Sequence, residues 1–171
     1  MTGRIFSGVQ MSMIIRRYES KDWGAICDIF NRAKPDELRG SIEPNAIVPL
    51  HKDEMLLKSF NDSILYVAEV KEKVIGYIGY SEALISFLFV DPNYYKTGIG
   101  TKLLEIVLPE VGEKAWLRVA KININAQELY RKFGFKVVEE FIGKYNGCNV
   151  EVLILALNPQ LESWKIKKAN N

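Results

Sequence analysis

Residues that build metal sites and disulfide frameworks are scarce in this sequence. It contains a single histidine, His51, and two cysteines, Cys27 and Cys148, which lie far apart and lack CxxC spacing. One histidine excludes every metal site that needs two, and two distant cysteines provide no disulfide framework. We therefore expect a protein with reduced thiols and no metal.

Long apolar runs and runs of like charge are also missing. No apolar stretch approaches the roughly 18 residues that a membrane span needs, and the first residues lack the apolar segment of a secretory signal. The 23 Lys and Arg nearly balance the 21 Asp and Glu, and no basic cluster resembles a nucleic-acid-binding arm. These features predict a cytoplasmic protein with no membrane or nucleic-acid partner, and they leave monomer and homodimer open.

Length and composition fit one globular domain. A chain of 171 residues, 48% of them hydrophobic, can bury a core without disulfides or metals. Residues 1–12 precede the first strand-like segment and are expected to form an N-terminal extension. The polar residues 158–171 are expected to form a C-terminal tail. The predicted domain is therefore 13–157.

Strand and helix patterns alternate along this domain in the order β-α-α-β-β-β-α-β-α-β-β, which predicts an α/β (α+β) fold. The run Leu84–Val90 is continuously apolar, as in a central strand covered on both faces, and begins a parallel βαβ unit. Residues 34–49 contain several Pro and Gly, which predicts a long connection beside a substrate cleft. The expected strands are 13–18, 64–70, 74–80, 84–90, 115–119, 135–145 and 150–157; helices are expected after Asp22, at 53–60, from Ile99 to Pro109 and at 126–133.

A glycine pair marks the turn from the apolar strand into the next helix. Gly98 and Gly100 lie where the first free N–H groups of a helix, and the positive end of its dipole, favour an anion such as phosphate. The turn is not a P-loop, because Thr101 and Lys102 stand in reverse order and the first glycine is missing. Leu103 replaces the third glycine of a Rossmann fingerprint. Helix-start geometry is the local alternative; the strand before the pair favours phosphate binding.

Two segments resemble motifs of the GNAT acyltransferase superfamily. The first is similar to the strand and [RQ]xxGxG[AG] loop that bind acyl-CoA pyrophosphate; it runs from Leu88-Phe89-Val90-Asp91-Pro92 into Tyr95-Lys96-Thr97-Gly98-Ile99-Gly100-Thr101. The second, Asn123 to Tyr130 followed by Gly134-Phe135, is similar to the NxxAxxLYxxxGF segment. Tyr95 stands where the family has Arg or Gln, and Thr101 where it has a small residue.

The resemblance implies a GNAT-like fold and an acetyltransferase. The fold would be a mixed, mostly antiparallel twisted sheet of about seven strands with a central parallel βαβ unit, flanked by about four helices. The activity would be transfer of an acetyl group from acetyl-CoA to a primary amine, first of a small molecule, by direct attack in a ternary complex without metal. The implied cofactor-binding residues are Leu88, Phe89, Val90, Tyr95, Lys96, Thr97, Gly98, Ile99, Gly100, Thr101, Asn123 and Ala126.

Two of the implied site residues also have local explanations. Tyr130 is implied to be the general acid that protonates the leaving thiolate. It also lies on one helix face with Leu129 and Phe133, as a core tyrosine would. Asn123 is either a cofactor-facing residue or a helix cap.

The acceptor presents the harder problem for catalysis. An aliphatic amine with a pKa of about 10.4 is almost fully protonated at neutral pH, so its proton must be removed before attack. Glu82, at the mouth of the apolar strand, is the candidate side-chain base, with Glu69 as second choice and a water-relayed base as the alternative. The residues expected around the acceptor, Asp36, Glu37, Glu43 and Tyr145, have no dominant charge. Acetylation of a protein N-terminus or lysine, and a CoA-binding module without turnover, stay open.

Overall fold

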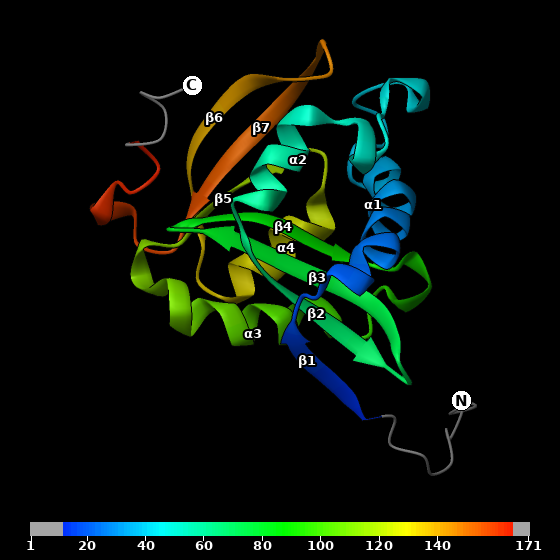
Figure 1. Ribbon diagram of the computed structural model, residues 1–171. Helices are drawn as coiled ribbons and strands as arrows, with labels where there is room; N and C mark the ends of the chain where they lie inside the picture. The colour runs from blue at the N-terminus through cyan, green and yellow to red at the C-terminus, as the bar shows by residue number, and fades with distance from the viewer. Residues whose placement is uncertain (1–11, 166–171) are drawn as a thin grey trace, which may run out of the picture.

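The computed structural model describes residues 12–165, which form a seven-stranded sheet with four α-helices (Figure 1). Within these residues the strand order is β1-β2-β3-β4-β5-β7-β6, and every neighbouring pair is antiparallel except β4–β5. The predicted element order and fold class are confirmed. The strands are β1 (Met13–Arg17), β2 (Ile64–Val70), β3 (Lys73–Ser81), β4 (Leu84–Val90), β5 (Trp116–Ala120), β6 (Lys136–Tyr145) and β7 (Cys148–Ala156); the helices are α1 (Trp23–Glu37), α2 (Glu54–Asn61), α3 (Ile99–Val111) and α4 (Ile124–Lys132).

Helices cover both faces of the sheet, α1 and α2 on one and α3 and α4 on the other (Figure 1). The core under α3 and α4 includes Leu103 and Leu104, and the core under α1 and α2 includes Ile26 and Tyr77. Apolar residues at helical spacing provide these buried faces, as the sequence pattern predicts. The sheet therefore has two separate cores, and β4 contributes to both.

Two helices continue past the prolines at which the sequence predicts an end. α1 includes Pro35 and ends at Glu37, and α3 includes Pro109 and ends at Val111. A proline so close to a helix end removes one backbone hydrogen bond, and burial of the residue that follows compensates for this loss. Leu38 and Val111 are both buried. The predicted connection 34–49 is therefore shorter, and Glu37 lies on a helix.

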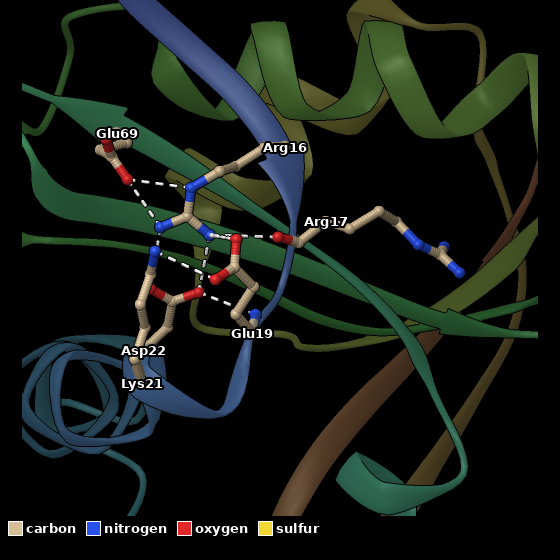
Figure 2. A network of polar contacts seen from close by, with 6 residues as sticks. All are labelled: Arg16, Arg17, Glu19, Lys21, Asp22 and Glu69. Atoms are coloured by element: carbon tan, nitrogen blue, oxygen red, sulfur yellow. Dashed lines mark hydrogen bonds and ion pairs between the residues drawn. The ribbon is translucent and has the colours of Figure 1, made fainter.

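The edge strand β1 is held by a network of ion pairs around Arg16 (Figure 2). The Arg16 guanidinium donates to Asp22 at 2.8 and 2.9 Å and to Glu69 of β2 at 2.9 and 2.6 Å. Asp22 lies at the N-cap of α1, as predicted, but makes no cap hydrogen bond; its carboxylate accepts from Arg16 and from the Glu19 backbone N–H. Donation from Arg16 lowers the pKa of Asp22. Every acceptor around Arg16 belongs to the fold, so this arginine is structural.

Part of the predicted C-terminal tail packs on the domain. Trp164 is 5% exposed and contacts the core cluster of Trp116 and Ile154. Residues 1–11 and 166–171 lie outside the described residues. None of the helices between residues 12 and 165 is long and apolar enough to cross a membrane. The same part of the chain contains no cluster of three or more His, Cys, Asp or Glu arranged to hold a metal ion.

Candidate active site

A cleft begins where β4 and β5 separate. In the described chain these parallel strands pair at Leu84 with Trp116 and at Ile85 with Leu117, and no further pairs follow. Ser86 is the extra residue of a bulge in β4, which breaks the register with β3. A bulge bends its strand, so β4 turns away from β5 beyond this point. The backbone groups of β4 that face the cleft therefore lack a strand partner and can bind an extended ligand.

Two cavities open along this cleft. We call the larger one, about 640 Å³, the loop-side cavity, because residues 94–96 and 98–101 line it together with α4. We call the smaller one, about 310 Å³, the sheet-side cavity, because it lies between α1, residues 118–120 of β5 and the β6–β7 hairpin. The two cavities meet: the residues lining both are Glu37, Leu88, Phe89, Asn123, Ala126 and Tyr130.

The burial pattern of β4 follows from this cleft. Ile85, Phe87 and Phe89 are buried, whereas the alternate residues are only partly buried. The strand is therefore covered fully on one face and partly on the other, where Leu88 and Val90 still pack against the core under α3 and α4. Leu88 and Val90 border the cavities, so an apolar run here includes ligand-facing residues as well as core residues.

The glycine pair forms one wall of the loop-side cavity. Gly98 is the N-cap of α3 with φ +86°, a left-handed conformation that favours glycine. At Gly100, a Cβ would lie 3.1 Å from Leu129 Cδ2, so a side chain here would crowd α4. The amides of the first turn of α3 have no intrahelical acceptor and lie at the positive end of the helix dipole. This wall is therefore suited to an anion such as a pyrophosphate.

Asp91 fixes the start of the same loop. Its side chain is 0% exposed and accepts two hydrogen bonds of 2.9 Å from Arg32 of α1 and one of 2.9 Å from the Asn93 backbone N–H. Donation from Arg32 is the largest cause that lowers the pKa of Asp91 to about 2. Asp91 is therefore more than the strand end that the sequence predicts. It joins the loop that precedes α3 to α1.

Tyr95 and Thr97 have roles that the motif does not indicate. The Tyr95 hydroxyl donates to Asp36 of α1 at 3.3 Å, so this side chain bridges the rim of the loop-side cavity. The Thr97 hydroxyl donates to the Tyr94 carbonyl, and Thr97 lines neither cavity. Apart from Thr97, every residue expected to bind the cofactor lines at least one cavity.

Tyr130 and Glu37 lie at the junction of the cavities. Tyr130 is 7% exposed and makes an edge contact with Phe135, so it is a core residue as well as a cavity residue. Burial, and second the charge of Glu37, raise the pKa of Tyr130 well above its ordinary value. A phenol with a raised pKa stays protonated at neutral pH and is available to donate. Among the residues lining both cavities, Glu37 is the carboxylate.

Asn123 both caps a helix and lines the cleft. Its side-chain oxygen accepts from the Ala126 backbone N–H at 3.2 Å, which caps α4. The same residue lines both cavities, so the side-chain amide group of the cap lies beside the cleft. A capping role and a ligand-facing role are compatible here.

The structure does not bring the predicted bases to this junction. Glu82 lies in the tight β3–β4 turn with φ +53°, at the end of β4 where β4 and β5 still pair, whereas the cleft opens beyond Ile85. Glu69, on β2, forms an ion pair with Arg16 of β1. Neither residue lines either cavity. A general-base role for Glu82 stays a prediction. The position of Glu82 at the opposite end of β4 from the cleft argues against this role.

Comparison with known proteins identifies the family. The family model described as an acetyltransferase (GNAT) domain matches residues 61–137. YafP of Escherichia coli strain K12, described as an uncharacterized N-acetyltransferase, is 30% identical over 128 residues, which are 74% of this chain and 83% of YafP. The chain belongs to the GNAT acetyltransferase family. As a GNAT protein it is an acetyl-CoA-dependent acetyltransferase, which confirms the predicted family and enzyme class.

Solved GNAT structures share the same fold. A GCN5-related N-acetyltransferase from Rhodopseudomonas palustris has a TM-score of 0.70 at 18% identity, covering 88% of this chain and all (100%) of that chain. YncA from Salmonella typhimurium, solved with acetyl-CoA, has a TM-score of 0.64 at 20% identity, covering 86% of this chain and 94% of that chain. The open edge of β4, the free amides of α3 and the loop-side cavity suit such a cofactor in this GNAT protein.

Sequence reasoning missed the charged side chains of the sheet-side cavity. Lys34 comes from α1, Arg118 from β5 and Lys144 from β6. These residues belong to no shared motif, and only the folded sheet brings their segments together. The sequence placed residues 34–49 and Tyr145 around the acceptor, close to Lys34 and Lys144, but it gave no sign that Arg118 belongs with them.

Proposed function

We propose that this GNAT protein acetylates the primary amine of a small molecule by direct attack in a ternary complex. The observation that carries the proposal is the meeting of two cavities at Glu37 and Tyr130. The loop-side cavity would hold acetyl-CoA, and the sheet-side cavity the acceptor. At about 310 Å³, the sheet-side cavity matches the lower end of the range for small-molecule pockets.

The loop-side residues would bind and orient the cofactor. The first-turn amides of α3 would donate to the pyrophosphate, and the unpaired edge of β4 would bind the pantetheine amides as an added strand does. This edge reaches the junction at Leu88 and Phe89. Backbone N–H groups there would also stabilise the negative charge that develops on the acetyl carbonyl oxygen. Acetyl-CoA supplies the thioester; the protein supplies the geometry.

Glu37 and Tyr130 would handle the protons. Glu37 would accept the proton of the acceptor ammonium, directly or through a water molecule, so that the neutral nitrogen can attack the carbonyl carbon. As the carbon–sulfur bond breaks, the Tyr130 hydroxyl would donate a hydrogen bond to the leaving thiolate, whose ordinary pKa is about 8.5. Transfer of the second nitrogen proton to this thiolate completes the amide and gives the free CoA thiol, and Glu37 then passes the first proton to water. Glu37 thus replaces Glu82 as the proposed base.

The test combines acetyl-CoA, purified protein and a panel of small primary amines, with free thiol and product mass as readouts. We expect acceptor-dependent thiol release, with one acetylated amine formed per thiol. Thiol release that needs no acceptor, or none with any amine while acetyl-CoA binds, would contradict the proposal. With a confirmed acceptor, Glu37→Gln and Glu82→Gln are compared across pH. We expect Glu37→Gln to lower kcat by about 100-fold or more; a loss confined to Glu82→Gln would restore the sequence-based assignment.

A further inference from the structure

The sheet-side cavity is lined by more positive than negative charge. Its charged residues are Lys34, Glu37, Arg118 and Lys144, three cations against one carboxylate. Lys144 lies near the end of β6 and is exposed, as Arg118 also is. The two other cations lie on the walls of the cavity, Lys34 on the helix side and Arg118 on the sheet side. Their surroundings differ in a way that points to a ligand.

Lys34 already has partners within the fold. Its side chain is 12% exposed, and Nζ lies 2.9 Å from the Glu37 carboxylate. The same ammonium lies 5.1 Å from the ring centre of Tyr145 and 5.8 Å from that of Phe89. An ion pair and aromatic faces together compensate the burial of a lysine. Lys34 therefore positions Glu37 and has little capacity left for a ligand.

Arg118 has different partners. The charge of Glu139 acts on it, and its guanidinium lies over the Trp116 ring, 5.6 Å from the ring centre. By contrast, Arg16 and Arg32 each bind carboxylates with two or more hydrogen bonds. Burial lowers the pKa of Arg118, whereas the bound carboxylates raise the pKa of Arg16 and of Arg32. A guanidinium has five N–H donors, and Arg118 is one of the residues that line the sheet-side cavity.

We infer that Arg118 binds an anionic group of the acceptor, so that the substrate is an amine bearing a carboxylate or phosphate rather than a simple amine or a polyamine. The inference rests on the proposed function, because it assigns the acceptor to this cavity. Arg118 on the sheet wall and Glu37 on the helix wall line the same space, so one small molecule can present its anion to the first and its amine to the second. The planar fork of arginine fits carboxylate and phosphate oxygens in pairs.

Charge also argues against other acceptors for this cavity. A diamine or polyamine would bring a second ammonium close to Arg118 and Lys34, and like charges in a partly desolvated site repel. A neutral amine would make no charge-assisted hydrogen bond with the guanidinium. An anionic amine avoids the repulsion and makes this bond.

The experiment uses pairs of acceptors that differ in the anion alone. One arm compares amino acids with their amides, and a second arm compares aminoalkyl phosphates with the corresponding amino alcohols; the arms distinguish carboxylate from phosphate. We expect kcat/KM to be at least 10-fold higher for the anionic member in one arm. Arg118→Gln should lower kcat/KM for that member by 10- to 100-fold, mainly through KM, with the KM of acetyl-CoA within twofold of wild type. Arg118→Lys should restore part of the loss, because it keeps the charge without the fork.

Arg17→Gln is the matched control. Arg17 also lies over an aromatic ring, 5.1 Å from the centre of Tyr66, and lines neither cavity, so its loss should not change acceptor preference. Equal or better turnover of neutral amines, or an Arg118→Gln variant with unchanged KM for the anionic member, would overturn the inference and leave the proposed function intact. If acetyl-CoA binds but no member of either arm nor any other amine is acetylated, the proposed function fails, and the inference fails with it.

Discussion

The two cavities of the cleft are built from different parts of the chain. The loop-side cavity is formed largely by one continuous segment, from β4 through the glycine pair into α3, with α4 opposite. Its binding groups are mainly backbone amides and an open strand edge. The sheet-side cavity is lined by residues 85–89 of β4 together with residues of α1, α2, β5 and the β6–β7 hairpin, which are far apart in the sequence. In the proposed function, backbone groups bind what GNAT proteins have in common, the cofactor, and side chains bind what can differ, the acceptor.

The largest expected effect comes from the residue at which the two cavities meet. Tyr130→Phe keeps the ring packed against Phe135 and removes the hydroxyl, so stability should barely change. We expect kcat to fall by about 100-fold or more, while the dissociation constant of acetyl-CoA stays within a few-fold. The measurement is steady-state kinetics with a confirmed acceptor, supported by calorimetry of acetyl-CoA binding. If the variant turns over at the wild-type rate while chemistry is rate-limiting, Tyr130 has only a packing role in the core.

A smaller effect is expected at the anchor of the loop-side cavity. The pKa of Asp91 is lowered from 3.8 to about 2, so its interactions stabilise the fold above about pH 4 and are lost as the pH falls toward 2. Asp91→Asn should therefore lower the free energy of unfolding at neutral pH by on the order of 2 kcal/mol. The difference from wild type should shrink between pH 4 and 2. Urea unfolding at several pH values measures both.

The exposed Asp62 provides the control for this pH dependence. Asp62→Asn should follow the wild-type stability profile. If the free energy of unfolding of Asp91→Asn instead stays below that of wild type by a constant amount down to pH 2, the ionised Asp91–Arg32 pair does not stabilise the loop.

The smallest effect is expected at Tyr95. Tyr95→Arg places the family's cation beside the phosphate site, and a charge-assisted contact is worth about 1.5 to 3 kcal/mol when well placed. Because Tyr95 is 41% exposed, we expect less than about 1 kcal/mol, which is a tightening of acetyl-CoA binding of less than about fivefold. Calorimetry measures it. Weaker binding would mean that the tyrosine itself, held by Asp36, contributes contacts that arginine cannot replace.

The contrast between the cavities also explains what the sequence could predict. The glycine pair, Asn123 and Tyr130 lie in two continuous segments that resemble GNAT motifs, so this resemblance could indicate them as site residues. Glu37 lay in a stretch that Pro35 made irregular in sequence, and tertiary packing extended the helix through it. Arg118 is one exposed residue in a buried strand, and only the folded structure shows that it lines the same cavity as Glu37.

Binding of acetyl-CoA to paired glycine variants tests the central claim most directly. Gly98 and Gly112 lie at opposite ends of α3, both with positive φ and with open space where a Cβ would lie, but only Gly98 lines the loop-side cavity. By calorimetry we expect wild type, Gly112→Val and Arg118→Gln to bind acetyl-CoA with similar dissociation constants. Gly98→Val should bind at least 10-fold more weakly while remaining folded by circular dichroism. If Gly98→Val binds acetyl-CoA as tightly as wild type, the cofactor site is not built from the backbone of this turn. If Gly112→Val or Arg118→Gln weakens binding as much as Gly98→Val does, the cofactor site is not separate from the acceptor cavity.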